Sequence, residues 1–254
     1  MTFQLCTIKE ISIFVSMGKQ TNRGKEAKDD QLFGETVKAV FTDALRDLHY
    51  LLSRKYSEKN ALQVVGTRYR LTQRQNRALQ CMGASQEQLD SVKEKELTVD
   101  KLAGQDLVLD GFNVLILLES LFSQAYLFKG LDGCYRDLSS VHGTYKKVSQ
   151  TSLALEAVSR FYQENKIKSI LWIFDKPVSN SGRIKKMIEE WAASENMKWE
   201  VLLENNADEA IIKSGKITVT SDAYILRNCK NWFNAIGYLI VEKQLPATIF
   251  EVEL

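Results

Sequence analysis

The chain has 254 residues, of which 44% are hydrophobic and 26% charged, and its formal net charge is +2 at pH 7. This length suits one large domain or two small ones, and the near-neutral charge excludes a uniformly basic surface while allowing a local basic patch. The four cysteines form no CxxC pair and there are only two histidines, so we expect no structural zinc site and thiols that stay reduced in a cytoplasm.

Residues 1–30 are expected to form a flexible or over-extended tail. The first 16 residues are fairly apolar, but they lack a basic start and contain Lys9 and Glu10, which argues against a signal peptide. No apolar run in the chain approaches the ~20 residues of a membrane-spanning helix. We therefore expect a cytoplasmic protein with no membrane partner.

Residues 31–100 predict a helical domain. Apolar residues recur at helical spacing from Val37 to Leu51, and Ser57 and Thr72 stand where helix-capping residues are favoured. A polar, charged stretch over residues 85–104 has the composition of a junction between two units. The first domain boundary is therefore expected near residue 100.

A basic segment lies within this helical domain, between residues 54 and 77. It holds seven basic residues and a single acid, Glu58, in a loosely helix-turn-helix-like arrangement. A solvated charged helix face explains such a segment without any partner. The functional interpretation is contact with nucleic-acid phosphates, for which the candidates are Arg68, Arg70, Arg74 and Arg77.

Residues 101–254 alternate short β-rich runs with helical patterns. The β-rich runs are "DLVLD", "KSILWIFD", "KWEVLLE", "KITVTSD" and "AIGYLIV", and the helical patterns lie near residues 151–165, 182–195, 206–213 and 223–232. Such alternation predicts an α/β fold with a central, mainly parallel sheet covered on both faces. The insertion "YLFKGLDGCYRDLSSVHGTYKK" is expected to form a hairpin that turns at "LDG". Its Arg136, Lys146 and Lys147 could contact phosphates, or they could be ordinary surface charges.

Acidic residues stand at the ends of several apolar runs. Asp110, Asp175 and Asp222 each end such a run, and Asp208 opens the helix after another. If the strands are parallel, these four carboxylates meet at one edge of the sheet, where ligands bind in open α/β folds. Their mutual repulsion would be relieved by a hard divalent cation with oxygen ligands, such as Mg²⁺ or Mn²⁺.

Each acid also has an explanation without a metal. Carboxylates are favoured at helix starts, which accounts for Asp208, Glu209 and Asp222, and a strand-ending turn accounts for Asp175. Asp110 stands in the most apolar surroundings, within "LVLDGFNVLI". There, Gly111 is expected to let the chain turn sharply, and Asn113 to orient a ligand or a carboxylate.

The segments "LVLDGFNVLI", "LWIFD", "NNADEAII" and "TVTSDAYIL" resemble, in this order, the acidic motifs of PIN-like and NYN-type metal-dependent nucleases, over about residues 105–241. The whole chain also resembles an uncharacterised prokaryotic family that joins a helical domain to such a PIN-like domain. The resemblance implies a three-layer α/β/α sandwich for residues 101–254, with Mg²⁺ or Mn²⁺ as cofactor and nucleic acid, RNA foremost, as partner. It departs at Tyr224, where related nucleases often carry another acid, and only Glu119 or Glu156 could supply the helix acid of the PIN pattern.

The resemblance assigns residue roles. The catalytic, metal-binding acids would be Asp110, Asp175, Asp208 and Asp222. Supporting residues would be Asn113, Glu209, Asp132, Ser221 and Ser179. Beyond the basic segment, nucleic-acid contacts would come from Lys146, Lys176 and Arg183. Asp132 also fits a turn residue, and Ser179 and Ser181 fit helix caps as well as phosphate ligands.

Three functional hypotheses follow. The first is metal-dependent hydrolysis of phosphodiester bonds in nucleic acid. The second is a catalytically inactive module that binds RNA, DNA or a protein partner. The third is a metal-dependent phosphohydrolase that acts on a small nucleotide. A homodimer is compatible with all three.

Overall fold

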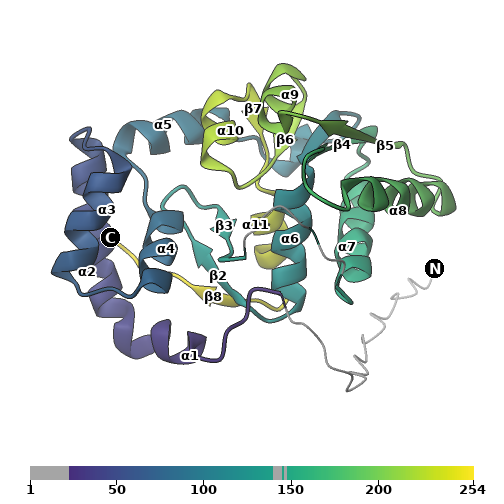
Figure 1. The fold of residues 1–254 in the computed structure, drawn as a ribbon. Helices are drawn as coiled ribbons and strands as arrows, with labels where there is room; N and C mark the ends of the chain where they lie inside the picture. Colours follow the sequence, from purple (N-terminus) through teal and green to yellow (C-terminus); the bar gives the residue numbers. More distant parts are fainter. Residues whose placement is uncertain (1–22, 140–144, 146–147) are drawn as a thin grey trace, which may run out of the picture.

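The computed structural model describes residues 23–139, 145 and 148–254, so Lys146, Lys147 and the first 22 residues lie outside it. An N-terminal helical region packs beside an α/β region built on a five-stranded sheet (Figure 1). The helical region comprises α1 (Asp29–Leu32), α2 (Glu35–Ser53), α3 (Glu58–Arg68), α4 (Gln73–Met82), α5 (Gln86–Lys95) and the short η1 (Val99–Lys101).

The helices of this region begin at capping residues that the sequence supplies. Ser57 accepts a hydrogen bond from the Asn60 backbone N–H, and Thr72 and Ser85 each start a helix with a reciprocal capping box. Thr72 and Ser57 are thus caps, as predicted.

The central sheet has the strand order β5-β4-β1-β6-β7, and every neighbouring pair is parallel. Its strands are β1 (Asp106–Asp110), β4 (Ser169–Asp175), β5 (Trp199–Glu204), β6 (Ile217–Val219) and β7 (Asn231–Trp232). The helices around it are α6 (Gly111–Phe122), α7 (Thr151–Glu164), α8 (Ser181–Ser194), α9 (Ala207–Lys213), α10 (Ala223–Asn228) and α11 (Ala235–Val241). The α/β class and the parallel sheet are therefore confirmed.

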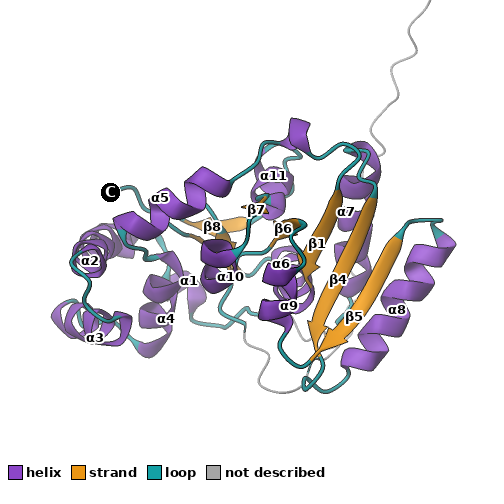
Figure 2. Ribbon diagram, turned by 90° about the horizontal axis from the view of Figure 1, so that it is seen from above, coloured by secondary structure: helices purple, strands orange, loops and turns teal. Residues whose placement is uncertain are grey.

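Successive side chains along the strands pack alternately into two hydrophobic clusters, one on each face of the sheet. Leu107 and Leu109 of β1 join a cluster with residues of α6, α7, α8 and α11, whereas Val108 joins one with residues of α5, α9 and α10. This follows from the two-residue period of a strand. Figure 2 shows α7 and α8 on one side of the sheet and α9 and α10 on the other.

The strand order reverses direction at β1. The chain runs from β1 outward to β4 and β5, then returns to place β6 and β7 on the other side of β1. At such a point the loops after the two central strands diverge and leave a crevice beyond their carboxyl ends. The crevice is expected between the ends of β1 and β6, which are Asp110 and the segment after Val219.

A second, smaller sheet joins the two regions. It has the order β3-β2-β8, with β2 (Tyr126–Lys129), β3 (Tyr135–Arg136) and β8 (Thr248–Phe250). Strands β2 and β3 are antiparallel, which confirms the predicted hairpin. Its Phe128, with Phe250, lies in one hydrophobic cluster with residues of the helical region, so this core draws on both sides of residue 100.

Two segments differ from expectation. The run "AIGYLIV" was expected to be a strand, but it forms α11, and the end of the helical pattern near 223–232 contains β7. A short apolar run buried on all sides has no period that separates strand from helix. Two residues expected in the flexible tail are held by contacts: Arg23 pairs with Glu119 at 2.6 Å, and Asp29 is fully buried.

No helix within the described parts of the chain has the length and apolar character that crossing a membrane requires.

Candidate functional site

The four predicted acids lie at the carboxyl edge of the central sheet. Asp110 and Asp175 are the last residues of the adjacent strands β1 and β4. Asp222 follows β6, the other neighbour of β1, and Asp208 lies in the first turn of α9, directly after β5. Because all these strands are parallel, their ends share one edge, and the acids come from four different strand ends.

A threonine hydroxyl links the two acids at the crevice. Thr220 Oγ1 donates to Asp110 Oδ2 over 2.7 Å and accepts from the backbone N–H of Asp222 over 3.0 Å. Asn113 Oδ1 accepts from the backbone N–H of Ser221 over 2.8 Å. Asn113 therefore holds the segment that carries Asp222. Sequence reasoning overlooked Thr220, although its place two residues before Asp222 in "TSD" was a usable signal.

The carboxylates influence one another electrostatically. Burial raises the pKa of Asp110 to about 7, and the negative charges of Asp222 and Asp208 add to the effect. Burial also raises the pKa of Asp208, followed by the charges of Asp222 and Asp175. Neighbouring like charges make each carboxylate harder to ionise, and a nearby cation would reverse this. The edge is thus an anionic cluster that favours a cation.

Asp222 has a second role as a helix cap. Its Oδ1 accepts from the backbone N–H groups of Tyr224 and Ile225, over 2.8 and 3.0 Å. The predicted cap explanation is therefore correct for this residue, and it is compatible with a ligand role for the second carboxylate oxygen.

The four carboxylates suit a hard cation only if other ligands complete its coordination. Among the residues that the structure describes, no three acidic, histidine or cysteine side chains gather closely enough to hold a metal ion by themselves. Mg²⁺, however, is commonly held by one or two carboxylates, with water and substrate phosphate filling its other positions. The carboxylates available for that role are Asp110, Asp175, Asp208 and Asp222.

The predicted supporting acids are engaged elsewhere. Glu209 accepts from the Tyr224 hydroxyl over 2.9 Å and pairs with Lys213 at 3.3 Å. Both contacts lower the pKa of the Glu209 carboxyl, the tyrosine contact most. The non-acidic Tyr224 thus ties α10 to α9. Glu119, the candidate helix acid, is buried within α6, where it accepts from Tyr145 and Thr151.

Asp132 is both a turn residue and the partner of a buried arginine. Its Oδ1 accepts from the Cys134 backbone N–H, and both carboxylate oxygens contact the Arg136 guanidinium. Arg136 also donates to the carbonyl oxygens of Cys81, over 3.0 Å, and Ser221, over 2.8 Å. We call this the Arg136 clamp. It joins α4 to the Ser221–Asp222 segment, so Arg136 is unavailable as the phosphate ligand that the sequence suggested.

The serines at the start of α8, Ser179 and Ser181, do not act as caps. The cap position is Asn180, which has a left-handed backbone and no side-chain capping bond. Ser179 is exposed, and its carbonyl accepts from the Tyr145 backbone N–H. Ser181 is buried and donates to the Lys176 carbonyl over 3.2 Å. The cap interpretation of these two serines is therefore wrong.

Gly111 is needed for a reason other than the predicted turn. It is the first residue of α6, and it is not among the glycines with a left-handed backbone. A Cβ at this position would lie 2.5 Å from the ring of Phe174. Glycine is thus required because β4 packs closely against the residue that follows Asp110.

The predicted phosphate-binding residues are dispersed. Arg74 is occupied internally by Asp29, Glu26 and the Gly24 carbonyl. Arg77 donates to the Leu138 carbonyl. Arg68, the last residue of α3, and Arg70, which follows the helix, are exposed, and Arg68 pairs with Asp47. Lys176 and Arg183 are exposed beside Asp175 and on α8, and Lys146 lies outside the described residues.

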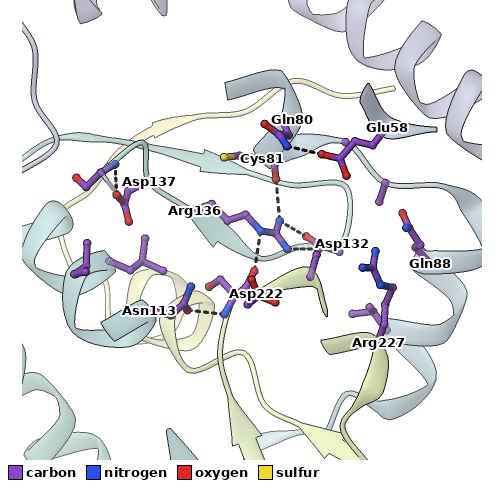
Figure 3. Close-up of a pocket in the computed structure, with 18 of the residues that line it drawn as sticks. Glu58, Gln80, Cys81, Gln88, Asn113, Asp132, Arg136, Asp137, Asp222 and Arg227 are labelled. Carbon is purple, nitrogen blue, oxygen red and sulfur yellow. Dashed lines mark hydrogen bonds and ion pairs between the residues drawn. The ribbon is translucent and has the colours of Figure 1, made fainter. Parts of the chain in front are cut away.

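A cavity of about 450 Å³ lies beside Asp222, between the helical and α/β regions (Figure 3). Its α/β wall includes Asn113, Asp222 and Ala223, and its helical wall includes Ala84 and Gln88. The Arg136 clamp borders it. Sequence reasoning could not find this cavity, because its walls are formed by segments that are distant in the chain and no motif marks them.

Comparison with known proteins places both regions among families of unknown function. Residues 40–95 match a family described as "Protein of unknown function (DUF434)". The chain is also 29% identical, over 185 residues, to an uncharacterized protein of Methanocaldococcus jannaschii, and this match covers 73% of the chain and 88% of that relative. Residues 99–238, more than half of the chain, match the family described as "Domain of unknown function (DUF5616)", and the protein belongs to this family.

Proposed function

We propose that this protein is a PIN-like nuclease that uses Mg²⁺ or Mn²⁺ to hydrolyse phosphodiester bonds in nucleic acid, with RNA as the first substrate to test. The observation that carries the proposal is the set of four carboxylates at the carboxyl edge of a parallel sheet, at the point where the strand order reverses. The order of the acidic motifs supports the same assignment, as do the helices that pack on both faces of the parallel sheet. We propose a three-layer PIN-like architecture for residues 101–254.

The residues at the acidic edge would have different roles. Asp110 and Asp222 would hold the cation, with Asp175 and Asp208 extending the anionic cluster toward β5. A bound divalent cation would lower the pKa of a coordinated water and neutralise charge on the phosphate. Thr220 keeps Asp110 and the Asp222 backbone in register through its hydroxyl, and Asn113 fixes Ser221.

A second candidate is a module that binds nucleic acid without cutting it. It is favoured by the capping role of Asp222 and by the lack of a three-ligand group among the described side chains. Such a module would bind RNA with a strong dependence on salt, and chelation of metals would leave binding unchanged.

A cleavage assay separates the two candidates. Labelled single-stranded RNA is incubated with Mn²⁺ and with wild type, Asp110→Asn, Asp222→Asn or Asp106→Asn. Asn is itself a good N-cap, so Asp222→Asn should preserve α10. Asp106 lies at the opposite end of β1 and serves as the control. We expect cleavage by wild type and Asp106→Asn, and at least a hundredfold loss in the other two with unchanged circular dichroism. Retained cleavage in Asp110→Asn would refute the proposal.

A further inference from the structure

We infer that the cavity beside Asp222 receives one unpaired nucleotide of a single strand, and that the strand continues past Arg227 onto Lys55 and Tyr56 of the helical region. This inference rests on the proposed nuclease function, because the strand is taken to start at the acidic edge, to which Asp222 belongs. It makes the helical region a part of the substrate site and names single-stranded nucleic acid as the substrate class.

The size and lining of the cavity suit a base with its sugar. Its volume of about 450 Å³ lies within the ~300–1,000 Å³ range of ligand pockets. Phe112, Ile116 and Leu117 supply apolar surface, and Asn113 and Gln88 supply polar groups. A base that remains stacked in a duplex cannot enter such a pocket, whereas an unpaired or extruded base can.

The negative charge of the cavity lining determines which part of a nucleotide can enter. Glu58, Asp137 and Asp222 all line the cavity, while Arg136 is already paired with Asp132. These acids would repel a bare phosphate group. The uncharged base and sugar are therefore the parts of a nucleotide that this cavity accepts, and the flanking phosphates must lie at its rim.

Arg227 supplies a cation at that rim. It is half-buried on α10 and lines both the cavity and an adjoining hollow. Within the described ranges, its guanidinium has no hydrogen bond or ion pair, and Figure 3 shows it pointing into the cavity. In contrast, the Arg136 guanidinium is fully engaged by the clamp. A guanidinium suits both a backbone phosphate and the face of a base.

The adjoining hollow extends the path onto the helical region. Its volume is about 410 Å³, and it shares Glu58, Gln88 and Arg227 with the cavity. It adds Lys55, whose exposed ammonium pairs with Glu87 at 3.7 Å, and Tyr56, which is 56% exposed. Cationic groups interleaved with exposed aromatic rings are the usual track for single strands, since bases stack on the rings. Because the carboxylate of Glu58 would repel phosphate groups, we expect the phosphates of the strand to lie on the side of Arg227 and Lys55.

The test measures binding without catalysis. Fluorescein-labelled 12-nucleotide RNA and DNA of one sequence, each single-stranded or annealed to its complement, are titrated in EDTA at low salt, and fluorescence anisotropy is recorded. The variants are Arg227→Ala, Tyr56→Ala and Ala223→Trp, the last filling the cavity from an exposed helix position. Their matched controls, outside both hollows, are Arg46→Ala, Tyr50→Ala (57% exposed) and Ala193→Trp.

We expect the single strands to bind more tightly than the duplexes, and each path variant to bind about tenfold more weakly than its control. Tighter binding of RNA than of DNA that is lost in Ala223→Trp would support a contact between the cavity and the 2′-hydroxyl. Duplex binding equal to single-strand binding, unchanged affinity in the three path variants, or no binding by wild type would each overturn the inference. Because EDTA removes the cation, these outcomes are scored independently of cleavage: loss of the nuclease proposal alone would leave this binding pattern intact.

Discussion

Asp110 shows how a single residue connects the fold to the proposed chemistry. It ends the central strand of the sheet, and its burial raises its pKa from an ordinary value of 3.8 to about 7. Between these two values the native state holds a proton that the unfolded state has released. Stability therefore falls as the pH rises from about 4 to about 7, and the whole penalty is present above pH 7.

Asp110→Asn should remove this penalty. We expect the gain in unfolding free energy over wild type to be larger at pH 8 than at pH 5 by about 2 kcal/mol, after allowance for partial solvent access. Urea unfolding in EDTA at the two pH values measures this difference. Asn retains an acceptor for the Thr220 hydroxyl, so the local contact survives.

Asp106→Asn, the matched control at the other end of β1, should change the unfolding free energy in the opposite direction at pH 8. Hydrogen bonds from Ser169 and Lys168 lower the pKa of Asp106. Its stabilising contribution is present above its ordinary pKa and is lost as the pH falls. Asp106→Asn should therefore weaken the protein at pH 8 rather than strengthen it. A gain at pH 8 in both variants would show that the effect of Asp110→Asn is not specific to the acidic edge.

At the scale of elements, the Arg136 clamp joins hairpin β2–β3, helix α4 and the segment before α10. Removing one partner of a buried ion pair leaves the other charge uncompensated. Arg136→Met should therefore lower the free energy of unfolding by about 3 kcal/mol. Asp132→Leu added to Arg136→Met should recover part of this loss, because no buried charge remains.

Urea titrations of wild type and the two clamp variants provide the measurement. Equal losses in the single and double variants would show that the contacts to the Cys81 and Ser221 carbonyls, rather than the ion pair, dominate the clamp.

At the scale of the whole molecule, the two ends of the described chain share one core. Phe250, near the C-terminus, is fully buried, and its ring centroid lies 4.8 Å from that of Phe41 and 5.6 Å from that of Phe33. Figure 1 shows the C-terminus beside the N-terminal helices. The core of the N-terminal helical region is thus completed by β8, a strand near the C-terminus.

Phe250→Ala should destabilise both regions together, by about 3 kcal/mol, because it opens a cavity in their common core. All four tryptophans lie between residues 172 and 232, so their fluorescence reports on the α/β region, while far-ultraviolet circular dichroism also follows the N-terminal helices. We expect the two signals to shift to lower urea by the same amount and to remain coincident. Separate transitions would show that the helical region unfolds on its own.

The sequence was sufficient for the features that depend on local patterns. The alternation of β-rich and helical patterns indicated the parallel α/β class. Residue type at the helix starts indicated the caps Ser57 and Thr72, and the turn residues "LDG" indicated the hairpin near Asp132. The acids Asp110, Asp175 and Asp222 were found because each ends an apolar run, and the edge that they share follows from parallel strands alone.

The remaining features depend on contacts between distant residues. The pairing of Asp29 with Arg74 and the packing of Phe250 on Phe41 join segments that carry no common motif. For the same reason Arg136 looked like a surface cation, although the fold surrounds it with acceptors. The run 235–241 was misassigned because uniform burial removes the periodicity that separates a helix from a strand.

Calorimetric titration of Mn²⁺ at pH 7.5 tests the central claim most directly. Wild type is compared with Asp110→Asn/Asp222→Asn and with Asp106→Asn, all checked for folding by circular dichroism. We predict binding by wild type and Asp106→Asn, no measurable binding by the double variant, and proton release on binding, since Asp110 titrates near pH 7. A folded wild-type protein that gives no heat with Mn²⁺, or a double variant that binds as tightly as wild type, would contradict a metal site at this edge of the sheet.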